Sequence, residues 1–130
     1  MDKQQIAMRL VLRELDQDID MTAFLDRFTL QKTIYLAQAL GINLGYYFNW
    51  YLYGPYCSSL ASDGFATQEE MRALGEDELL RWHLDPKTIT KLNNIRSIFQ
   101  DQDKKQLAKN LELLASVHFL IPVSYTHLRA

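Results

Sequence analysis

The sequence has few of the residues that build metal, redox or phosphate sites. Cys57 is the only cysteine among 130 residues, so no internal disulfide can form. The three histidines stand apart, and no Cys-x-x-Cys, His-x-x-x-His or Glu-x-x-His spacing occurs, which argues against a metal site. The five glycines are dispersed, and none belongs to a phosphate-binding glycine-rich loop. We expect a protein that binds neither a metal nor a cofactor.

A strong net charge and long apolar runs are also missing. The formal net charge is −2, which gives no overall attraction for nucleic acid or an anionic membrane. No apolar run approaches the roughly 20 residues of a transmembrane helix. The segment after Met1 lacks the basic-then-apolar layout of a secretory signal. We therefore expect a cytoplasmic protein without a membrane partner, and we disfavour nucleic acid as a partner.

What is present is a single globular domain built mainly from helices. A hydrophobic content of 48% over this length is enough for one core. Apolar periodicity, capping residues and helix-stop signals indicate the helices. They are segment 2–15, a second helix ending at Gly41, a short turn 58–63 ended by Gly64, an acidic helix opened by a Thr67-x-x-Glu70 capping box, a helix opened by Asp85-Pro86, and a last helix with Leu107, Leu111, Leu114, Ala115 and His118 facing the core.

The segment from Gly45 to Tyr53 differs from the rest because it is dense in aromatic residues. It is typical of a strand or hairpin packed against helices. Gly54 is expected to form a sharp turn, and Pro55 is expected in the first turn of the following helix. The predicted fold class is mainly helical α+β, with about five helices around a small antiparallel strand or hairpin.

The aromatic segment is also the main candidate for a binding surface. Its six rings exceed what one face of a short strand can bury, and they belong to Tyr46, Tyr47, Trp50, Tyr51, Tyr53 and Tyr56. Tyrosine and tryptophan often anchor protein interfaces. Stacking on nucleobases normally needs interleaved Lys or Arg, and segment 45–66 has neither. Packing of most rings in the core remains the alternative.

Two short motifs resemble a known family. The run Leu30-Gln31-Lys32-Thr33-Ile34-Tyr35-Leu36-Ala37-Gln38, an aromatic strand, and then Tyr53-Gly54-Pro55-Tyr56 resemble, in order and spacing, the SocA-like antitoxin domain, also called Panacea. The branch with Gly-Pro-Tyr-Ser in the turn, which includes YwgA-like bacterial and archaeal proteins, is the most similar, with Cys57 in place of serine. Segment 113–120 resembles the late helix of that branch, so the resemblance covers about residues 25–120.

The resemblance implies a small helix-rich domain without enzymatic activity. Such domains are the antitoxin half of prokaryotic or phage toxin–antitoxin pairs, or adaptors that present a toxin to a protease. The partner expected for this chain is therefore a toxin or another protein. The signature positions carried over as partner-binding or structural residues are Gln31, Lys32, Tyr35, Trp50, Tyr53, Gly54, Pro55 and Tyr56.

Two other functions stay open. A helix pair within 86–120 is locally basic and would suit a nucleic-acid-binding regulator; its cations are Lys87, Lys91, Arg96, Lys104, Lys105 and Lys109. Cys57 stands just before an expected helix start, a position suited to the nucleophile of a cysteine-dependent enzyme, although no base lies nearby in the sequence.

The C-terminal segment 123–130 matches none of the expected elements. After Ile121-Pro122 the helical pattern is expected to end. The last eight residues resemble the translation of sequencing-adapter read-through, and an ordinary frayed terminus is the alternative. We expect one domain over 1–122, truncated at its C-terminus, followed by a non-native tail to which no function is assigned.

Overall fold

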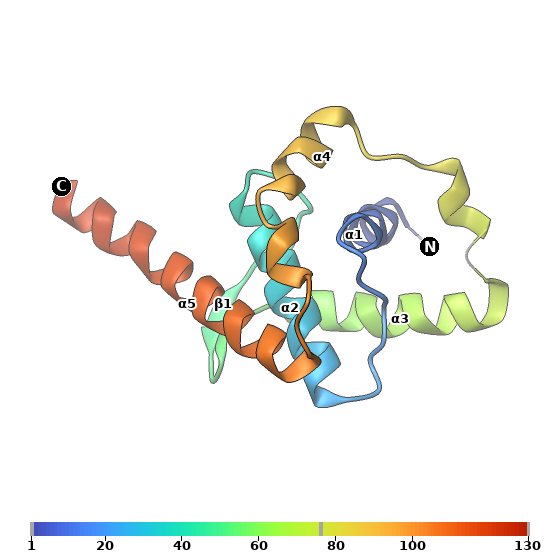
Figure 1. Cartoon of the computed structure of the whole chain (residues 1–130), viewed down its shortest axis with the longest axis horizontal. Coiled ribbons are helices and arrows are strands. Elements are labelled where there is room, and N and C mark those ends of the chain that lie inside the picture. Colours follow the sequence, from blue (N-terminus) through green and yellow to red (C-terminus); the bar gives the residue numbers. More distant parts are fainter. Residues whose placement is uncertain (1, 76, 130) are drawn as a thin grey trace.

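The computed structural model of the chain describes residues 2–75 and 77–129, with side chains described up to Ile121. The described residues form five α-helices, two short 3₁₀ helices and one two-stranded antiparallel sheet (Figure 1). This confirms the predicted mainly helical α+β class. In chain order the elements are α1 (Lys3–Glu14), α2 (Phe24–Ala39), β1 (Asn49–Tyr51), β2 (Gly54–Tyr56), α3 (Ser58–Leu74), η1 (Asp77–Arg81), α4 (Pro86–Asn93), η2 (Arg96–Phe99) and α5 (Lys104–Arg129).

Helix α1 is an amphipathic helix with a complete N-terminal cap. The Asp2 carboxylate accepts a hydrogen bond from the Gln5 backbone N–H at 2.8 Å, and the Gln5 side chain accepts one from the Asp2 N–H at 3.4 Å. These two bonds satisfy backbone N–H groups at the start of the helix, which have no hydrogen-bond partner within the helix itself. The predicted apolar face is confirmed, because Ile6, Leu10 and Val11 are all buried.

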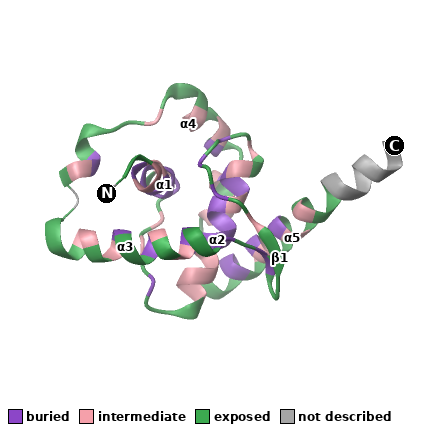
Figure 2. Ribbon diagram, turned by 180° about the vertical axis from the view of Figure 1, so that it is seen from behind, coloured by how far each residue is buried: buried purple, intermediate pink, exposed green. Residues whose placement is uncertain are grey.

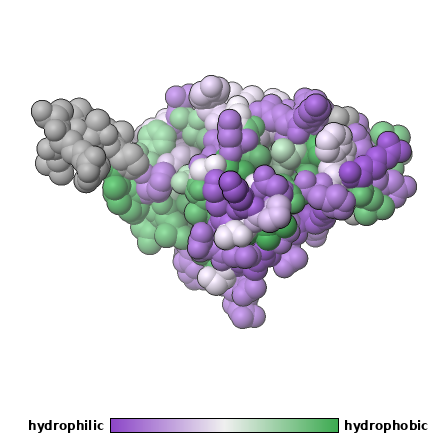
Figure 3. Space-filling model, turned by 90° about the horizontal axis from the view of Figure 1, so that it is seen from above, coloured by the Kyte–Doolittle hydropathy of each residue, from purple (hydrophilic) through white to green (hydrophobic). Residues whose placement is uncertain are grey.

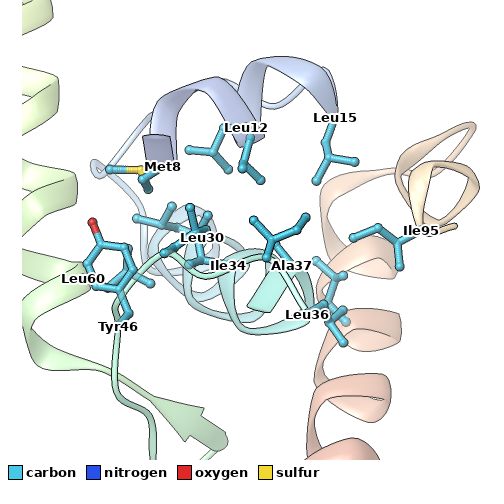
Figure 4. Close-up of a cluster of buried hydrophobic side chains, with 14 of the residues drawn as sticks. Met8, Leu12, Leu15, Leu30, Ile34, Leu36, Ala37, Tyr46, Leu60 and Ile95 are labelled. Atoms are coloured by element: carbon cyan, nitrogen blue, oxygen red, sulfur yellow. The ribbon is translucent and has the colours of Figure 1, made fainter. Parts of the chain in front are cut away.

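Helix α2 lies at the centre of the molecule. It contacts α1, α3, α5 and β2, and Figure 2 shows its middle part as buried. Burial runs around its whole circumference from Leu30 to Ala37, except at the half-buried Tyr35, as expected of a helix packed on several sides. In the core, Met8, Leu12 and Leu15 of α1 face α2 (Figure 4). The helix stops before Gly41, whose φ of 93° suits glycine, as predicted.

The prediction of two separate helical pieces between residues 58 and 74 is wrong. The chain forms one continuous helix, α3, through Gly64 and Thr67. Gly64 is needed for packing, because a Cβ atom there would lie 2.8 Å from side-chain atoms of Leu30 and Met21. The Thr67 hydroxyl donates to the Asp63 carbonyl one turn earlier instead of capping a new helix.

The turn after the aromatic segment also differs from the prediction. Pro55 lies in strand β2 opposite Trp50, and helix α3 begins only at Ser58 with Cys57 at its N-cap position. The strand in the aromatic segment is limited to Asn49–Tyr51. A proline is tolerated here because the hairpin has only two strands, so β2 has a free edge. Gly54 turns the chain with φ at 96°, a conformation that suits glycine.

The C-terminal half begins as predicted and ends differently. The Asp85 carboxylate caps α4 by accepting from the Thr88 N–H at 2.7 Å, and Asp103 caps α5 in the same way at the Gln106 N–H. Helix α4 ends at Asn93, and η2 continues towards α5. Helix α5 runs past Ile121 to Arg129, which corrects the prediction that helix ends there. The hypothesis that residues 123–130 are a non-native tail concerns side chains that lie outside the described part of the structure.

Within the described residues, no helix is both long enough and apolar enough to cross a membrane.

Candidate functional site

The structure divides the eight predicted site residues into three groups around the hairpin. Four of them are buried in the hairpin or beneath it, two line a groove beside it, and two pack with α5. The buried group is Gln31, Lys32, Gly54 and Pro55; the groove group is Tyr53 and Tyr56; the group at α5 is Tyr35 and Trp50. The predicted positions therefore meet in one region, but they do not form one surface.

Gln31 fastens the end of the hairpin to α2. Its side-chain amide donates to the Cys57 carbonyl and accepts from the Cys57 N–H, both at 2.8 Å. Gln38 does the same for Tyr46, at 2.8 and 2.9 Å. The two glutamines are seven residues apart and thus lie on one face of the helix. Sequence reasoning missed Gln38, although this spacing was the signal that could have found it.

Tyr46 is a buried anchor and not a surface ring. It is 4% exposed, and its hydroxyl donates to the Asp63 carboxylate of α3 at 2.7 Å. Gln5 of α1 donates to the other carboxylate oxygen at 3.1 Å. Burial, followed by the hydrogen bond to Asp63, raises the pKa of Tyr46 far above its usual range. This network joins α1, the hairpin approach and α3.

Lys32 places a buried positive charge beneath the hairpin. The residue is 2% exposed, and its Nζ donates to the Pro55 carbonyl at 2.6 Å. The same ammonium lies 4.8 Å from the centre of the Phe28 ring, a cation–π distance. Burial lowers the pKa of Lys32 to about 8, although the negative charge of Glu112 opposes this shift. Lys32 thus combines a structural role with an unusual charge environment.

An apolar groove of about 350 Å³ lies between α2, the hairpin and α3. Its walls carry aromatic rings that remain partly exposed: Phe24 and Phe28 of α2, Tyr51, Tyr53 and Tyr56 of the hairpin, and Phe65 of α3. Tyr53 is 52% exposed and meets Phe24 and Phe28 edge-on, with ring centres 5.8 and 6.1 Å apart. The sequence analysis did not predict these phenylalanines as site residues. They are far from the hairpin in the sequence, and only the fold places α2 and α3 beside it.

Trp50 and Tyr35 belong to a second aromatic cluster on the opposite side of the hairpin. The Trp50 ring packs on Phe119 with ring centres 5.7 Å apart, and the Tyr35 hydroxyl is 2.7 Å from His118 Nδ1. Burial raises the pKa of Tyr35. Neighbouring strand residues point to opposite faces, so Trp50 cannot share a face with Tyr51. Trp50 therefore helps to dock α5 and lies outside the groove.

A further apolar surface lies on α5 itself. Hydrophobic residues gather beside the C-terminal end of this helix (Figure 3). On α5 itself, the large hydrophobic residues that are 42% to 65% exposed are Leu113, Leu114, Val117, Leu120 and Ile121. Leu114 was expected in the core, but Leu111 and Ala115 occupy the side of the helix that faces α2.

Cys57 lacks the surroundings of a catalytic thiol. Its side chain is buried, and its Sγ lies 3.2 Å from Ser59 Oγ. Among the described residues no imidazole is hydrogen-bonded to it, since His118 contacts Tyr35 and His83 lies in the exposed loop after η1. A nucleophilic cysteine needs an adjacent base or cation and access to substrate. In the same described part, no three His, Cys, Asp or Glu side chains gather as a metal site would require.

The basic residues of segment 86–120 are partly engaged within the fold. Arg96 pairs with Glu14 at 2.7 Å, Lys104 pairs with Asp26 at 3.2 Å, and Lys91 donates to the Gly41 carbonyl at 3.2 Å. Helix α4 packs on α1 and η2, whereas α5 packs on α2 (Figure 1). A helix-turn-helix needs two helices packed on each other with cations towards phosphate, so this arrangement does not favour that reading.

The resemblance noted in the sequence has no counterpart in the comparisons with known proteins. No family model, no curated protein and no solved structure matches this chain.

Proposed function

We propose that this chain is a non-catalytic protein-interaction module of the antitoxin or proteolytic-adaptor type. It binds a toxin or another protein and masks it by occupying its surface. The observation that carries the proposal is the apolar groove walled by partly exposed aromatic rings, where Tyr53 meets Phe24 and Phe28 edge-on. The antitoxin class and a prokaryotic or phage source come from the sequence resemblance. A cytoplasmic location, which suits the single free Cys57, is part of the proposal.

The chemistry of the groove supports a protein ligand. Aromatic residues supply large contact areas, and tyrosine adds a polar tip that can bond to a partner backbone. A partner segment seated here would provide the centre of an interface whose total area is about 1,200–2,000 Å². Buried anchors such as Gln31 and Lys32 hold the hairpin in place before binding. A rigid site loses less entropy when it binds.

The test compares the groove with a more exposed aromatic residue elsewhere. Tyr53→Ala/Tyr56→Ala removes two groove rings, whereas Tyr47→Ala removes a ring that is 88% exposed and lies outside the groove. Each purified chain is used to capture proteins from a host lysate, and the captured protein is then titrated by calorimetry. We expect wild type and Tyr47→Ala to retain one partner and the double variant to bind it at least about tenfold more weakly.

Circular dichroism controls for folding of the three chains. Equal capture by the double variant would contradict the groove as the binding site, and loss of capture by Tyr47→Ala alone would move the interface to the other side of the hairpin. Retention of nucleic acid that weakens steeply with salt would favour the regulator hypothesis instead.

A further inference from the structure

The groove carries a charge opposite to that of the whole molecule. The chain has a net charge of −2, yet the groove lining contains two cations, Arg27 and Lys32, and no Asp or Glu. No carboxylate among the described residues forms an ion pair with either cation. Apolar walls reduce screening by water, so a positive charge at this place attracts an anion more strongly than one on an open surface.

Lys32 also has hydrogen-bonding capacity that the described residues do not use. An ammonium group has three N–H donors. One of them bonds the Pro55 carbonyl, and the Phe28 ring offers its face to the charge. Among the described residues Lys32 makes no second hydrogen bond, and the Glu112 carboxylate, which acts on its charge, is not part of the groove lining. Burying a charged donor without partners is costly. An anionic acceptor that enters the groove would therefore be bound most favourably beside Lys32.

Arg27 lies at the side of the same groove in a restrained position. Its Nη1 donates to the carbonyls of Met21 and Thr22 at 2.9 and 3.1 Å. These bonds hold the guanidinium, whose remaining N–H groups suit a carboxylate. The half-buried Arg27 and the buried Lys32 of α2 thus supply two positive groups to the lining of one groove.

Resting on the proposed function, we infer that the groove recognises a partner segment that combines a bulky apolar side chain with an adjacent Asp or Glu. The apolar side chain packs among Tyr53, Phe24 and Phe65, and the carboxylate is bound by Lys32 and Arg27. Charge complementarity selects an acidic segment, and the aromatic walls select an apolar one. Neither feature alone would give this specificity.

The experiment begins with a display selection of random short peptides against the full chain. Peptides that also bind Tyr53→Ala/Tyr56→Ala are removed, so that only groove binders remain. We expect Asp or Glu next to Phe, Leu or Trp to be enriched. One enriched peptide is then synthesised with a fluorescent label in acidic form and with its carboxylate replaced by the amide. Fluorescence anisotropy should show about tenfold weaker binding of the amide form.

Arg27→Gln supplies a matched test on the protein side. This variant should weaken the acidic peptide and leave the amide peptide unchanged, and because Arg27 is half-buried it disturbs the fold less than a change at Lys32. Equal affinities of the two peptides, or groove binders without acidic residues, would overturn the inference while leaving the groove as a protein-binding site. A selection that yields no peptide sensitive to the Tyr53/Tyr56 change would count against both proposals.

Discussion

Lys32 shows how a single side chain links the packing of the hairpin to the groove. Its ammonium is held between the Pro55 carbonyl and the Phe28 ring, with 2% of the residue exposed. Burial disfavours the charged form, and the nearby Glu112 only partly offsets this effect. Proteins retain such groups at a cost in stability, and here the charge lies at the edge of an apolar groove.

The lowered pKa of Lys32 predicts a pH dependence of stability. The folded pKa is about 8 and the ordinary value is 10.5. Between these values the unfolded chain binds more protons, so the free energy of unfolding should rise with pH, by at most about 3 kcal/mol. Below about pH 8 the lysine is protonated in both states, so its contribution no longer changes.

Urea unfolding of wild type and Lys32→Met between about pH 8 and pH 9.5 measures this effect. The free energy of unfolding of wild type, taken relative to that of Lys32→Met, should rise as the pH rises. The raised pKa of Tyr46 acts in the opposite direction above about pH 10, but it is common to both chains and cancels. A parallel pH dependence of the two chains would contradict the assigned charge state.

Gly54 is required by both its backbone and its surroundings. Its φ is 96°, and an added Cβ would lie 2.6 Å from Ser116 Oγ. We expect Gly54→Ala to lower the free energy of unfolding by about 2–4 kcal/mol, from strain and overlap together. Gly75→Ala is the matched control. Gly75 has φ at 75°, and a Cβ added there would meet no atom of the described residues within 4 Å, so this variant should show the backbone strain alone.

The double variant Gly54→Ala/Ser116→Ala separates the two causes. Removing Oγ should restore the part of the stability that was lost to overlap, because Ser116 Cβ lies at 3.8 Å. Thermal unfolding followed by circular dichroism gives the values. Equal stability of the single and double variants would assign the whole effect to the backbone.

At the scale of elements, α3 shows that a glycine inside a helix can serve packing. Helix propensity alone predicts that Gly64→Ala stabilises α3 by about 0.5–1 kcal/mol. The structure predicts that Gly64→Ala destabilises the protein instead, because Met21 and Leu30 fill the space that the added Cβ would need. Both neighbours are buried and have little room to move.

We therefore expect Gly64→Ala to destabilise the protein by about 1–2 kcal/mol. In a Met21→Ala background the same substitution should be less destabilising, because one of the two obstructing side chains is gone and only Leu30 remains. Chemical denaturation of the four chains forms a double-mutant cycle. A stabilising Gly64→Ala in the wild-type background would show that Met21 and Leu30 adjust freely.

At the scale of the whole molecule, α2 organises the fold by contacting α1, α3, α5 and the hairpin. Helix α5 packs on it through Leu107, Leu111 and Ala115, and Arg96 ties the segment before α5 to the end of α1 through Glu14. Loosening α5 would therefore disturb both the core and the Trp50 side of the hairpin.

Two leucines on α5 test this arrangement. Leu111→Ala should lower the free energy of unfolding by about 2–5 kcal/mol, since Leu111 is fully buried. Leu114→Ala should cost less than about 1 kcal/mol, since Leu114 is 42% exposed. Urea unfolding measures both variants. Similar losses would place Leu114 in the core, as the helical periodicity had suggested.

Local patterns were sufficient for the helices whose ends carry side-chain caps. Asp2, Asp85 and Gly41 mark helix boundaries through hydrogen bonds or dihedrals that involve only nearby residues. The same local patterns gave wrong helix boundaries at Gly64 and Pro55. Judged by residue type alone, the glycine indicates the end of a helix and the proline indicates the start of one. Their true roles depend on Met21 and on Trp50, which a local window cannot place.

The sequence alone determined the fold class, the start of α4 at Asp85 and the end of α2 before Gly41, because periodicity and capping signals act over a few residues. Tertiary packing determined where the predicted site residues lie: it buried Gln31 and Lys32, turned Trp50 towards α5, and brought Phe24 and Phe65 beside Tyr53. The reason is that a groove consists of surfaces from separate elements, and their relative positions follow from the burial of the whole core.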